Sequence, residues 1–287
     1  MLILPPEISE SFSGSGDLWA RLFAMQGEVY REEGGRRTLR FSQQGQSYFL
    51  KTHQGIGWKE IFKNLLQGKT PVLSAVSEWN ALNRLQELGI SSPVAIGVGC
   101  RGHNPAARQS FLLTKDIGQS RTLEEVWFDW RTKKQWGPDR LRLKRALIRE
   151  VARIAATLHA HGLNHRDLYL CHFRIAPQTM SGEEGVRDGS VYLMDLHRAQ
   201  IRSRTPLRWI IKDLGALLFS CYPFGITRSD RLRFIKVYTQ LSPREAFKAK
   251  GECWARVERR ALRMYRKHGA PQLAAGLLTP SIEPSVQ

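Results

Sequence analysis

Apolar and polar residues alternate with a period of two in the stretch that follows residue 27. The alternation predicts three strands, at residues 28–33, 36–42 and 46–53. Gly34-Gly35 and Gln44-Gly45 supply the turns between them, because glycine accepts the backbone angles of a tight hairpin. The pattern therefore predicts an antiparallel three-stranded meander.

A helical period follows this meander. Trp79, Leu82 and Leu85 fall on one face of a helix predicted between residues 78 and 88. The intervening residues 54–72 predict a loop and a short amphipathic helix that a proline ends. Two further strands are predicted at residues 94–98 and 110–114. The order of three strands, a helix and two strands predicts a small sheet lobe that ends near residue 115.

The second half of the chain is rich in helical patterns. Apolar residues recur every three or four positions between residues 143 and 158, and Gly162 ends that helix. Further helices are predicted at residues 209–219, 228–240 and 252–267. We expect an α+β protein with an N-terminal extension, a sheet lobe, an α-rich lobe and a disordered tail. Their predicted boundaries are 1–27, 28–115, 116–270 and 271–287.

The composition is that of a globular protein with a large excess of positive charge. Hydrophobic residues make up 42% of the chain, and 44 Lys and Arg against 26 Asp and Glu give a formal net charge of +18. Such an excess predicts an acidic partner: nucleic acid, an anionic membrane face or a phosphorylated substrate. Solubility and the attraction of a nucleotide are the alternative. No nucleic-acid recognition motif is present, so we expect no nucleic acid.

Cysteine usage and hydropathy indicate the cellular setting. The four cysteines are scattered without a Cys-x-x-Cys pair, which fits a reducing compartment and argues against a structural zinc site. The first residues lack the basic and apolar regions of a signal peptide. The most apolar window, residues 209–226, is interrupted by Lys212-Asp213 and Pro223, which favours a buried helix over a transmembrane one. We therefore expect a cytoplasmic protein.

Residues 165–173 carry the clearest chemical signal. They read His165-Arg166-Asp167, with His172 five positions after Asp167, and they directly follow the long helix. A short apolar strand then ends in Asp195. This order of helix, loop, strand and aspartate is typical of a protein-kinase-like fold. We expect Asp167 to orient an acceptor hydroxyl for phosphoryl transfer, and Asp195 to bind a Mg²⁺ ion that bridges the phosphates of ATP.

Other residues complete the expected nucleotide site. Lys51 lies on the third strand and is expected to contact the α- and β-phosphates, held by an ion pair to Glu78. Glu60 and Glu87 are alternative partners for Lys51. The backbone of Gly34-Gly35 is expected to cover the phosphates, and an ordinary hairpin turn explains this pair equally well.

Further motifs accompany this constellation. They are Glu32-Glu33-Gly34-Gly35-Arg36-Arg37-Thr38, Lys51-x-His53-x-Gly55-Ile56-Gly57-Trp58, Lys63-Asn64-Leu65-Leu66 before Pro71-Val72-Leu73, Glu78-Trp79, Asn164-His165-Arg166-Asp167 with Cys171-His172-Phe173, and Asp195-Leu196-His197-Arg198-Ala199-Gln200. In these motifs the chain resembles the lipopolysaccharide core heptose(I) kinase family of Gram-negative bacteria, which is related to eukaryotic-type protein kinases. The resemblance implies a two-lobed protein-kinase-like fold. It also implies ATP-dependent phosphorylation of the first heptose of the inner core, at its 4-hydroxyl.

The chain departs from the protein-kinase pattern in three places. The phosphate loop lacks Gly-x-Gly-x-x-Gly. His172 stands where protein kinases place a metal-binding asparagine, and imidazole is a poorer Mg²⁺ ligand than an amide oxygen. We therefore expect His172 either at the metal or as a residue that orients Asp167. His197 replaces a glycine, so the usual phenylalanine switch is not expected.

The segment between Asp195 and Asp213 is too short for the activation loop and peptide platform of a protein kinase. A short segment predicts an open cleft for a sugar head group. Its arginines are expected to bind phosphates and carboxylates of the substrate, and a solvated basic loop is the alternative. They are Arg198, Arg202, Arg204 and Arg208, with Arg198 and Arg202 the leading candidates. Asp213 is expected to bond the backbone of the His-Arg-Asp loop.

The favoured interpretation is an ATP- and Mg²⁺-dependent sugar kinase. Its substrate would be the inner-core glycolipid of lipopolysaccharide, reached from the cytoplasmic face of the membrane with peripheral contact to anionic lipid. A protein kinase is the alternative within the same class. A basic pseudokinase that binds nucleic acid or membrane through the arginines of residues 256–267 is the alternative outside it.

Overall fold

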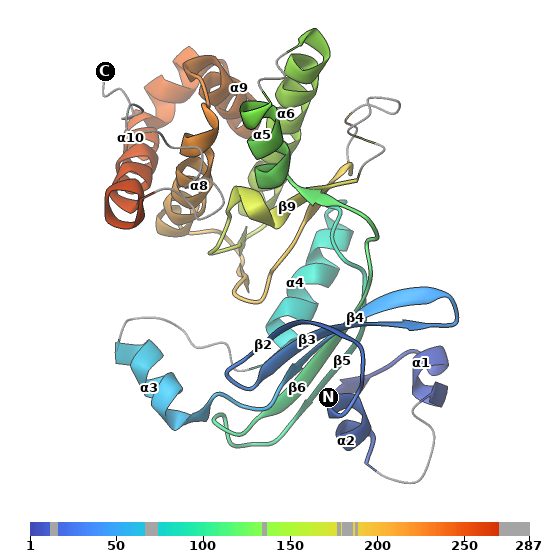
Figure 1. Ribbon diagram of the computed structural model, residues 1–287. Helices are drawn as coiled ribbons and strands as arrows, with labels where there is room; N and C mark the ends of the chain where they lie inside the picture. Colours follow the sequence, from blue (N-terminus) through green and yellow to red (C-terminus); the bar gives the residue numbers. More distant parts are fainter. Residues whose placement is uncertain are drawn as a thin grey trace. The chain divides into compact units, whose positions relative to one another are not determined.

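The computed structural model describes residues 1–11, 17–66, 74–133, 137–176, 179, 186 and 189–269. The chain forms two compact units, and Figure 1 labels most of their helices and strands. The first unit contains residues 1–87, 92–118 and 195–198, and the second contains residues 88–91, 119–194 and those from 199 onward. The tail predicted from residue 271 lies outside the described residues.

A six-stranded antiparallel sheet forms the centre of the first unit. Its strands run in the order β1 (Leu2–Ile3), β5 (Ala95–Arg101), β6 (Gln109–Lys115), β4 (Gln46–His53), β3 (Arg36–Gln43) and β2 (Glu28–Glu33). The last five correspond to the five strands that the sequence predicts, with β5 extending three residues further, and β1 adds an edge strand. All four residues of the two predicted turns, Gly34-Gly35 and Gln44-Gly45, have positive φ angles, as tight hairpins require.

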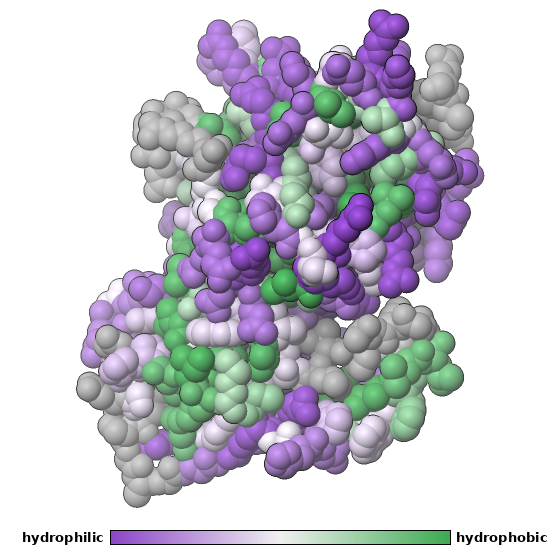
Figure 2. Space-filling view, turned by 180° about the vertical axis from the view of Figure 1, so that it is seen from behind, coloured by the Kyte–Doolittle hydropathy of each residue, from purple (hydrophilic) through white to green (hydrophobic). Residues whose placement is uncertain are grey.

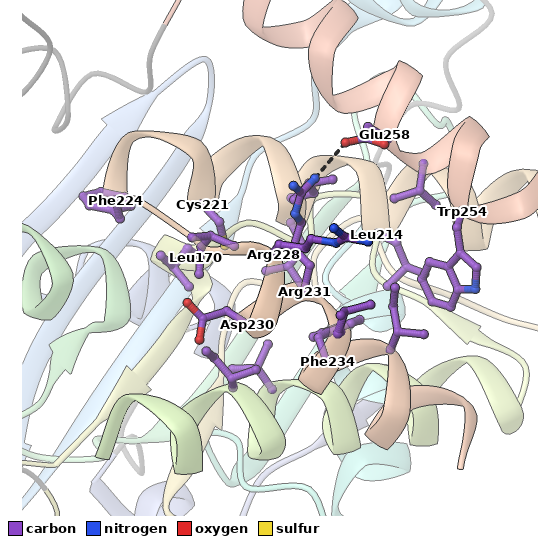
Figure 3. Close-up of a pocket in the computed structure, with 18 of the residues that line it drawn as sticks. Leu170, Leu214, Cys221, Phe224, Arg228, Asp230, Arg231, Phe234, Trp254 and Glu258 are labelled. Atoms are coloured by element: carbon purple, nitrogen blue, oxygen red, sulfur yellow. Dashed lines mark hydrogen bonds and ion pairs between the residues drawn. The ribbon is translucent and has the colours of Figure 1, made fainter. Parts of the chain in front are cut away.

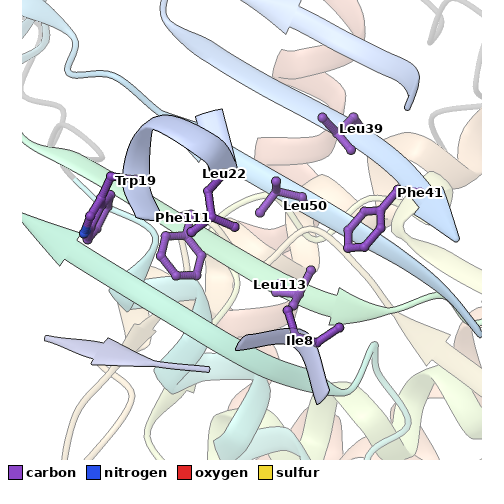
Figure 4. Close-up of a cluster of buried hydrophobic side chains, with 8 residues drawn as sticks. All are labelled: Ile8, Trp19, Leu22, Leu39, Phe41, Leu50, Phe111 and Leu113. Atoms are coloured by element: carbon purple, nitrogen blue, oxygen red, sulfur yellow. The ribbon is translucent and has the colours of Figure 1, made fainter. Parts of the chain in front are cut away.

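The N-terminal segment packs on one face of this sheet. Helices α1 (Pro6–Ser11) and α2 (Leu18–Phe23) place Ile8, Trp19 and Leu22 against apolar side chains of the strands (Figure 4). The Trp19 ring meets the Phe111 ring edge-on at 5.3 Å. Residues 1–24 have a weak sequence pattern because each helix has only six residues, too few to display a period. Packing nevertheless makes Ile8, Trp19 and Leu22 part of the core of the first unit.

Two more helices belong to the first unit. Helix α4 (Val76–Glu87) contacts β5 and β6 and buries Ala81, Leu82 and Leu85, together with the carboxylate of Glu78. Helix α3 (Gly57–Leu66) is the short amphipathic helix that residues 54–72 predict. In Figure 1, α3 projects away from the sheet. Both helices are confirmed, with α4 beginning two residues before its predicted start.

The second unit is mainly helical. Its helices are α5 (Leu123–Thr132), α6 (Pro138–Ala160), α8 (Leu207–Cys221), α9 (Arg228–Thr239) and α10 (Pro243–His268). The predicted stripe on α6 is buried at Leu147, Val151, Ile154 and Leu158. Helix α10 begins well before the predicted residue 252 and passes through a kink at Lys250. No helix in the described part of the chain is both long and apolar enough to span a membrane.

Short strands position the loops of the second unit. They are β7 (Arg121–Thr122), β8 (Leu163–Asn164), β9 (Phe173–Ile175), β10 (Val191–Leu193) and β11 (Gln200–Ile201), with 3₁₀ turns at Leu170–His172 and Tyr222–Phe224. Strand β9 lies between β10 and β7, and β11 pairs with β8. These pairings fix the ends of the segments that carry the His-Arg-Asp motif and Asp195.

A buried ion pair ties α6 to α9. Lys144 Nζ lies 2.6 Å from Asp230 Oδ2, and both side chains are almost inaccessible to solvent. Burial alone would raise the pKa of Asp230, but the Lys144 ammonium and bonds from Thr227 hold it below its ordinary value. A pair buried this well is costly to break, because removing one partner leaves an uncompensated charge.

Candidate active site

Lys51 and Glu78 form an ion pair inside the first unit. Lys51 Nζ of β4 lies 2.5 Å from Glu78 Oε1 of α4. Burial on its own would lower the pKa of Lys51, but the Glu78 and Asp195 carboxylates together raise it above its ordinary value. The lysine is therefore charged at neutral pH and fixed in direction. Glu78, the partner expected from the sequence, is the one that pairs with Lys51. The two alternative partners pair elsewhere: Glu60 with Lys63 at 3.2 Å and Glu87 with Arg84 at 2.6 Å.

Asp195 belongs to the first unit together with Lys51. Its backbone has a φ of +60°, which is uncommon for a residue with a side chain and often marks a functional position. His197 Nδ1 donates a hydrogen bond to Asp195 Oδ1. The Asp195 charge also acts on Arg36, whose pKa burial lowers. Asp195 therefore lies in a cluster with Lys51, Arg36 and His197, and His197 was not predicted to take part.

The Gly34-Gly35 turn is held close to the segment that leads to α3. Gly35 O accepts a hydrogen bond of 2.8 Å from Gln54 N. A Cβ atom on Gly35 would lie 2.9 Å from Gly55 O, so a side chain does not fit there. This close approach explains why a glycine is needed at position 35. The role of Gly34-Gly35 in covering the phosphates stays a prediction.

The His-Arg-Asp loop of the second unit is held by one buried carboxylate. Asp213 of α8 accepts hydrogen bonds from the backbone N–H groups of His165 at 2.7 Å and Arg166 at 2.8 Å. Asp213 is fully buried, and His159 Nε2 lies 3.3 Å from the same carboxylate. Arg166 has a positive φ of 74°, a conformation that costs free energy and needs such support. The backbone contact predicted for Asp213 is present.

Two histidines fix the groups next to the expected catalytic residues. His172 Nδ1 lies 2.7 Å from the backbone carbonyl oxygen of Asp167, so the ring donates to that loop. His165 Nε2 lies 2.9 Å from the carbonyl oxygen of Met194, the residue before Asp195. Met194 N in turn donates to His172 O at 2.9 Å. This geometry agrees with His172 as a residue that positions Asp167.

Four cations surround the ring of Trp209 in the second unit. The guanidinium carbons of Arg166, Arg202 and Arg208 lie 5.1, 5.7 and 5.6 Å from the ring centre, and Lys212 Nζ lies 4.2 Å from it. We call these four residues and Trp209 the basic cluster. Arg202 is held there by two neutral oxygens, Asn164 Oδ1 and Gln200 Oε1, each at 2.5 Å. A negative ligand would be strongly attracted to this cluster.

The two arginines expected to bind substrate lie in different units. Arg202 belongs to the basic cluster of the second unit, whereas Arg198 belongs to the first. Arg202 is also positioned through Gly162, because a Cβ atom there would lie only 1.8 Å from Arg202 O. The sequence therefore identified two members of the basic cluster, Arg202 and Arg208, and missed the ring around which they gather.

A large apolar pocket lies among the helices of the second unit (Figure 3). Its volume is about 750 Å³, and its lining comes from α5, α6, α8, α9 and α10. Leucine, isoleucine and phenylalanine side chains dominate the wall. Arg228 and Arg231 also line it, and Arg231 pairs with Glu258 at 2.7 Å. This volume is typical of a ligand-binding pocket.

Comparison with known proteins identifies the family. The model of the lipopolysaccharide kinase (Kdo/WaaP) family matches residues 20–238. The chain belongs to this family. It is 42% identical over 266 residues to the lipopolysaccharide core heptose(I) kinase WaaP of Pseudomonas aeruginosa. That alignment covers 93% of this chain and 96% of the relative. It is 45% identical over 222 residues to the Escherichia coli protein of the same name, covering 77% and 81%.

A solved structure agrees with this assignment. A WaaP in complex with acyl carrier protein superposes with a TM-score of 0.75 at 37% identity, over 92% of this chain and 99% of that chain. The family resemblance that the motifs indicated is confirmed, and so is the α+β, protein-kinase-like bilobal fold. As a member of a kinase family, this protein is an enzyme that uses ATP.

Some residues of the candidate site gave little signal in the sequence. Trp209 was predicted only as the start of a buried helix, because a single tryptophan does not reveal which cations meet it. Arg208 and Lys212 are four positions apart and share a helical face, so this spacing could have suggested that they act together. The apolar pocket had no sequence signal, since its lining residues look like ordinary core positions.

We predict that His53 makes the first unit sensitive to acid. Burial lowers the pKa of His53 to about 4, and the positive charges of Arg36, Lys51 and His197 add to the effect. The unfolded chain binds this proton with a pKa near 6.5, so the stabilisation is complete above that pH and is lost as the pH falls toward 4. Between pH 8 and pH 5 the loss should be about 2 kcal/mol.

Urea unfolding of wild type and His53→Gln at both pH values measures this loss. The variant should be less stable at pH 8 but lose about 2 kcal/mol less on going to pH 5. His103→Gln, in an exposed loop, is the matched control and should behave like wild type. Equal pH dependence in His53→Gln and wild type would show that His53 does not cause the acid sensitivity.

Proposed function

We propose that this kinase transfers the terminal phosphoryl group of ATP to the first heptose of the lipopolysaccharide inner core. The curated relatives at 42 and 45% identity carry that activity in their names. The observation on which the proposal chiefly rests is the fixed His-Arg-Asp loop, in which Asp213 binds two consecutive backbone amides beside Asp167. The 4-hydroxyl is the acceptor that the family resemblance suggests.

In this proposal the first unit binds the nucleotide. Lys51, oriented by Glu78, contacts the α- and β-phosphates, and the Gly34-Gly35 turn covers them. Lys51 is suited to this role because the two nearby carboxylates keep its ammonium charged. Arg36 follows the turn directly and supplies a further positive charge.

Asp195 fits the Mg²⁺ ion that a kinase of this kind would use. Its side chain is partly exposed, lies in the electrostatic field of Lys51, and offers the hard oxygen ligand that Mg²⁺ prefers. When bound, Mg²⁺ would neutralise the charge of the phosphates. His172 offers nitrogen and already donates from Nδ1 to the Asp167 carbonyl, so we assign it a positioning role.

Asp167 would orient the attacking hydroxyl of the heptose. A carboxylate within hydrogen-bond reach of an alcohol can accept its proton as the new P–O bond forms. His172 holds the backbone of Asp167, and Asp213 holds the two residues before it. Phosphoryl transfer depends mainly on positioning and charge neutralisation, so this rigid support is part of the proposed catalysis.

The basic cluster would bind the acidic groups of the acceptor. Arg166 immediately precedes Asp167 in the chain. Two neutral amide oxygens fix the guanidinium of Arg202. Guanidinium groups bind carboxylates and phosphates in a bidentate manner. Arg198, in the segment after Asp195, is a further candidate for this role. A sugar acceptor rich in anionic groups therefore suits this protein better than a neutral one.

We predict that Asp167→Asn abolishes phosphoryl transfer but leaves ATP binding largely unchanged. The amide cannot accept the hydroxyl proton, so transfer to lipopolysaccharide that lacks core phosphate should fall about 100-fold or more. A radiolabel-transfer assay measures the rate, and the shift in melting temperature with Mg-ATP measures nucleotide binding. Asp139→Asn, an exposed aspartate at the start of α6, is the matched control.

Transfer by Asp167→Asn at the wild-type rate would remove Asp167 from the mechanism. Transfer to peptides at a rate comparable to that for the glycan would favour a protein kinase. An absent melting shift in wild type with saturating Mg-ATP would favour a binding module without catalysis.

We predict that Arg208→Gln weakens binding of the acceptor without changing the chemical step. The exposed Arg208 guanidinium contributes charge to the basic cluster, so its loss should raise KM for the intact acceptor about tenfold and leave kcat nearly unchanged. Arg204→Gln removes the same charge from the same segment, outside the ring contacts of Trp209, and should have a smaller effect. Equal effects of the two variants would indicate a diffuse basic surface instead of a specific cluster.

We also propose that this kinase binds an acyl carrier protein. The 37% identical relative was solved as a complex with one. The apolar pocket of the second unit offers a lining suited to a fatty acyl chain, and Arg228 and Arg231 suit the phosphate of the carrier arm. Apolar and cationic groups therefore lie side by side, as such a ligand requires.

Leu218→Trp should fill the pocket and remove the preference for an acylated carrier. Wild type should bind acyl-loaded carrier protein at least about tenfold more tightly than the unloaded form, since burying a long chain contributes about 0.8 kcal/mol per methylene. Titration calorimetry measures both affinities, and Leu141→Trp, at an exposed position of α6, is the control. Equal binding of the two carriers by wild type would exclude the pocket as an acyl site.

The expected location follows from the substrate. An acceptor anchored in lipid requires this kinase to work at a membrane surface, so we propose a cytoplasmic enzyme in peripheral contact with the inner face of the membrane. The positive net charge supports that contact.

A further inference from the structure

Helix α3 exposes an unusual amount of apolar surface. Four of its ten residues are large apolar side chains that solvent reaches, with exposed fractions of 50% at Trp58, 58% at Phe62, 56% at Leu65 and 88% at Leu66. Single exposed apolar residues are normal on soluble proteins, but a contiguous group marks a surface that binds something. Figure 2 shows hydrophobic surface at the lower right of the view, on the side where α3 lies.

The exposed residues share one face of the helix. Trp58, Phe62 and Leu66 follow at steps of four, and Leu65 lies beside them. The Trp58 and Phe62 rings lie 5.8 Å apart. Among the described side chains of α3, only Ile61 is buried. The face therefore contributes almost nothing to the core of the first unit, and folding alone does not explain its composition.

Two lysines border this face. Helical spacing places Lys59 and Lys63 along one edge of the apolar surface, with Glu60 further around and paired with Lys63 at 3.2 Å. An apolar face that contains tryptophan and phenylalanine, next to lysines, is the pattern of a helix that lies in the interface of an anionic bilayer. A protein partner would not require this arrangement of lysines.

The base of α3 is fixed to the sheet. Gly57 N donates a 3.0 Å hydrogen bond to Ala106 O in the loop between β5 and β6. Gly55 has a φ of +87°, and a Cβ atom there would lie 2.4 Å from the same oxygen, so only glycine fits. These contacts hold the start of the helix while its apolar face remains exposed.

We propose that α3 docks this kinase on an anionic lipid bilayer, with Trp58, Phe62, Leu65 and Leu66 in the interfacial layer. Lys59 and Lys63 contact lipid phosphates, and the overall charge of +18 favours the same surface. The benefit of docking rests on the proposed function, since a lipid-anchored acceptor is found only at such a surface. Docking raises the local concentration of acceptor without any contact to the sugar.

Vesicle binding tests the proposal directly. Wild type should cosediment with phosphatidylglycerol-containing vesicles and much less with pure phosphatidylcholine vesicles. Phe62→Glu/Leu65→Glu should lower binding to the anionic vesicles about tenfold or more, because it replaces interfacial apolar area with charge. Lys59→Gln should lower it about fivefold. The control is Leu141→Glu/Leu241→Glu, which changes charge equally at two exposed leucines elsewhere and should bind almost as wild type does.

Phosphorylation assays separate this proposal from the proposed function. The α3 variant should phosphorylate delipidated core oligosaccharide in solution like wild type, and lose activity only on acceptor embedded in vesicles. Vesicle binding by the α3 variant equal to that of wild type would overturn the docking helix and leave the kinase activity standing. A wild type that does not bind vesicles but self-associates through α3 would also overturn the docking helix. In that case the apolar face of α3 would bind a second copy of the chain. If wild type binds vesicles through α3 but phosphorylates neither acceptor, the docking proposal is supported and the proposed heptose substrate is contradicted.

Discussion

The buried carboxylate of Asp213 holds the loop on which the proposed chemistry depends. It accepts hydrogen bonds from two consecutive amides, of His165 and Arg166, with no solvent to replace them if the side chain is lost. An unpaired buried backbone amide costs free energy, so this contact also supports the unfavourable φ of Arg166. The orientation of Asp167 follows from that support on one side and from His172 on the other. The chain thus stabilises the loop from a helix that lies almost fifty residues further on.

Positive charge has two different uses in this protein. Lys51 and Lys144 are neutralised by carboxylates at short distance, and both pairs fix secondary-structure elements to each other. In the basic cluster, three guanidinium groups and an ammonium gather on one indole ring, and two neutral oxygens position Arg202. So many cations at one place attract an anionic ligand. An acidic core oligosaccharide and a nucleotide are the ligands that this division of charge suits.

Two apolar surfaces of the described residues suit a lipid ligand. One is the internal pocket of the second unit, which five helices enclose. The other is the outer face of α3, whose base is fixed by glycines and whose apolar residues point to solvent. Concave and convex apolar surfaces suit different ligands: a pocket surrounds a single chain, whereas a projecting helix enters a bilayer interface. Both proposals connect a sugar kinase to lipid, and they can be tested independently.

The sequence alone determined the strands, most helices and the order of the motifs, because alternation, helical spacing and turn glycines are local properties of the chain. It also indicated the family, and the Lys51–Glu78 pair followed from motif order. Only the tertiary structure decided that helices α1 and α2 pack on the sheet and that His197 meets Asp195. It alone gathered Arg166, Arg202, Arg208 and Lys212 around Trp209. The physical reason is that most of these contacts join residues from different elements, so only packing and hydrogen bonding in three dimensions bring them together.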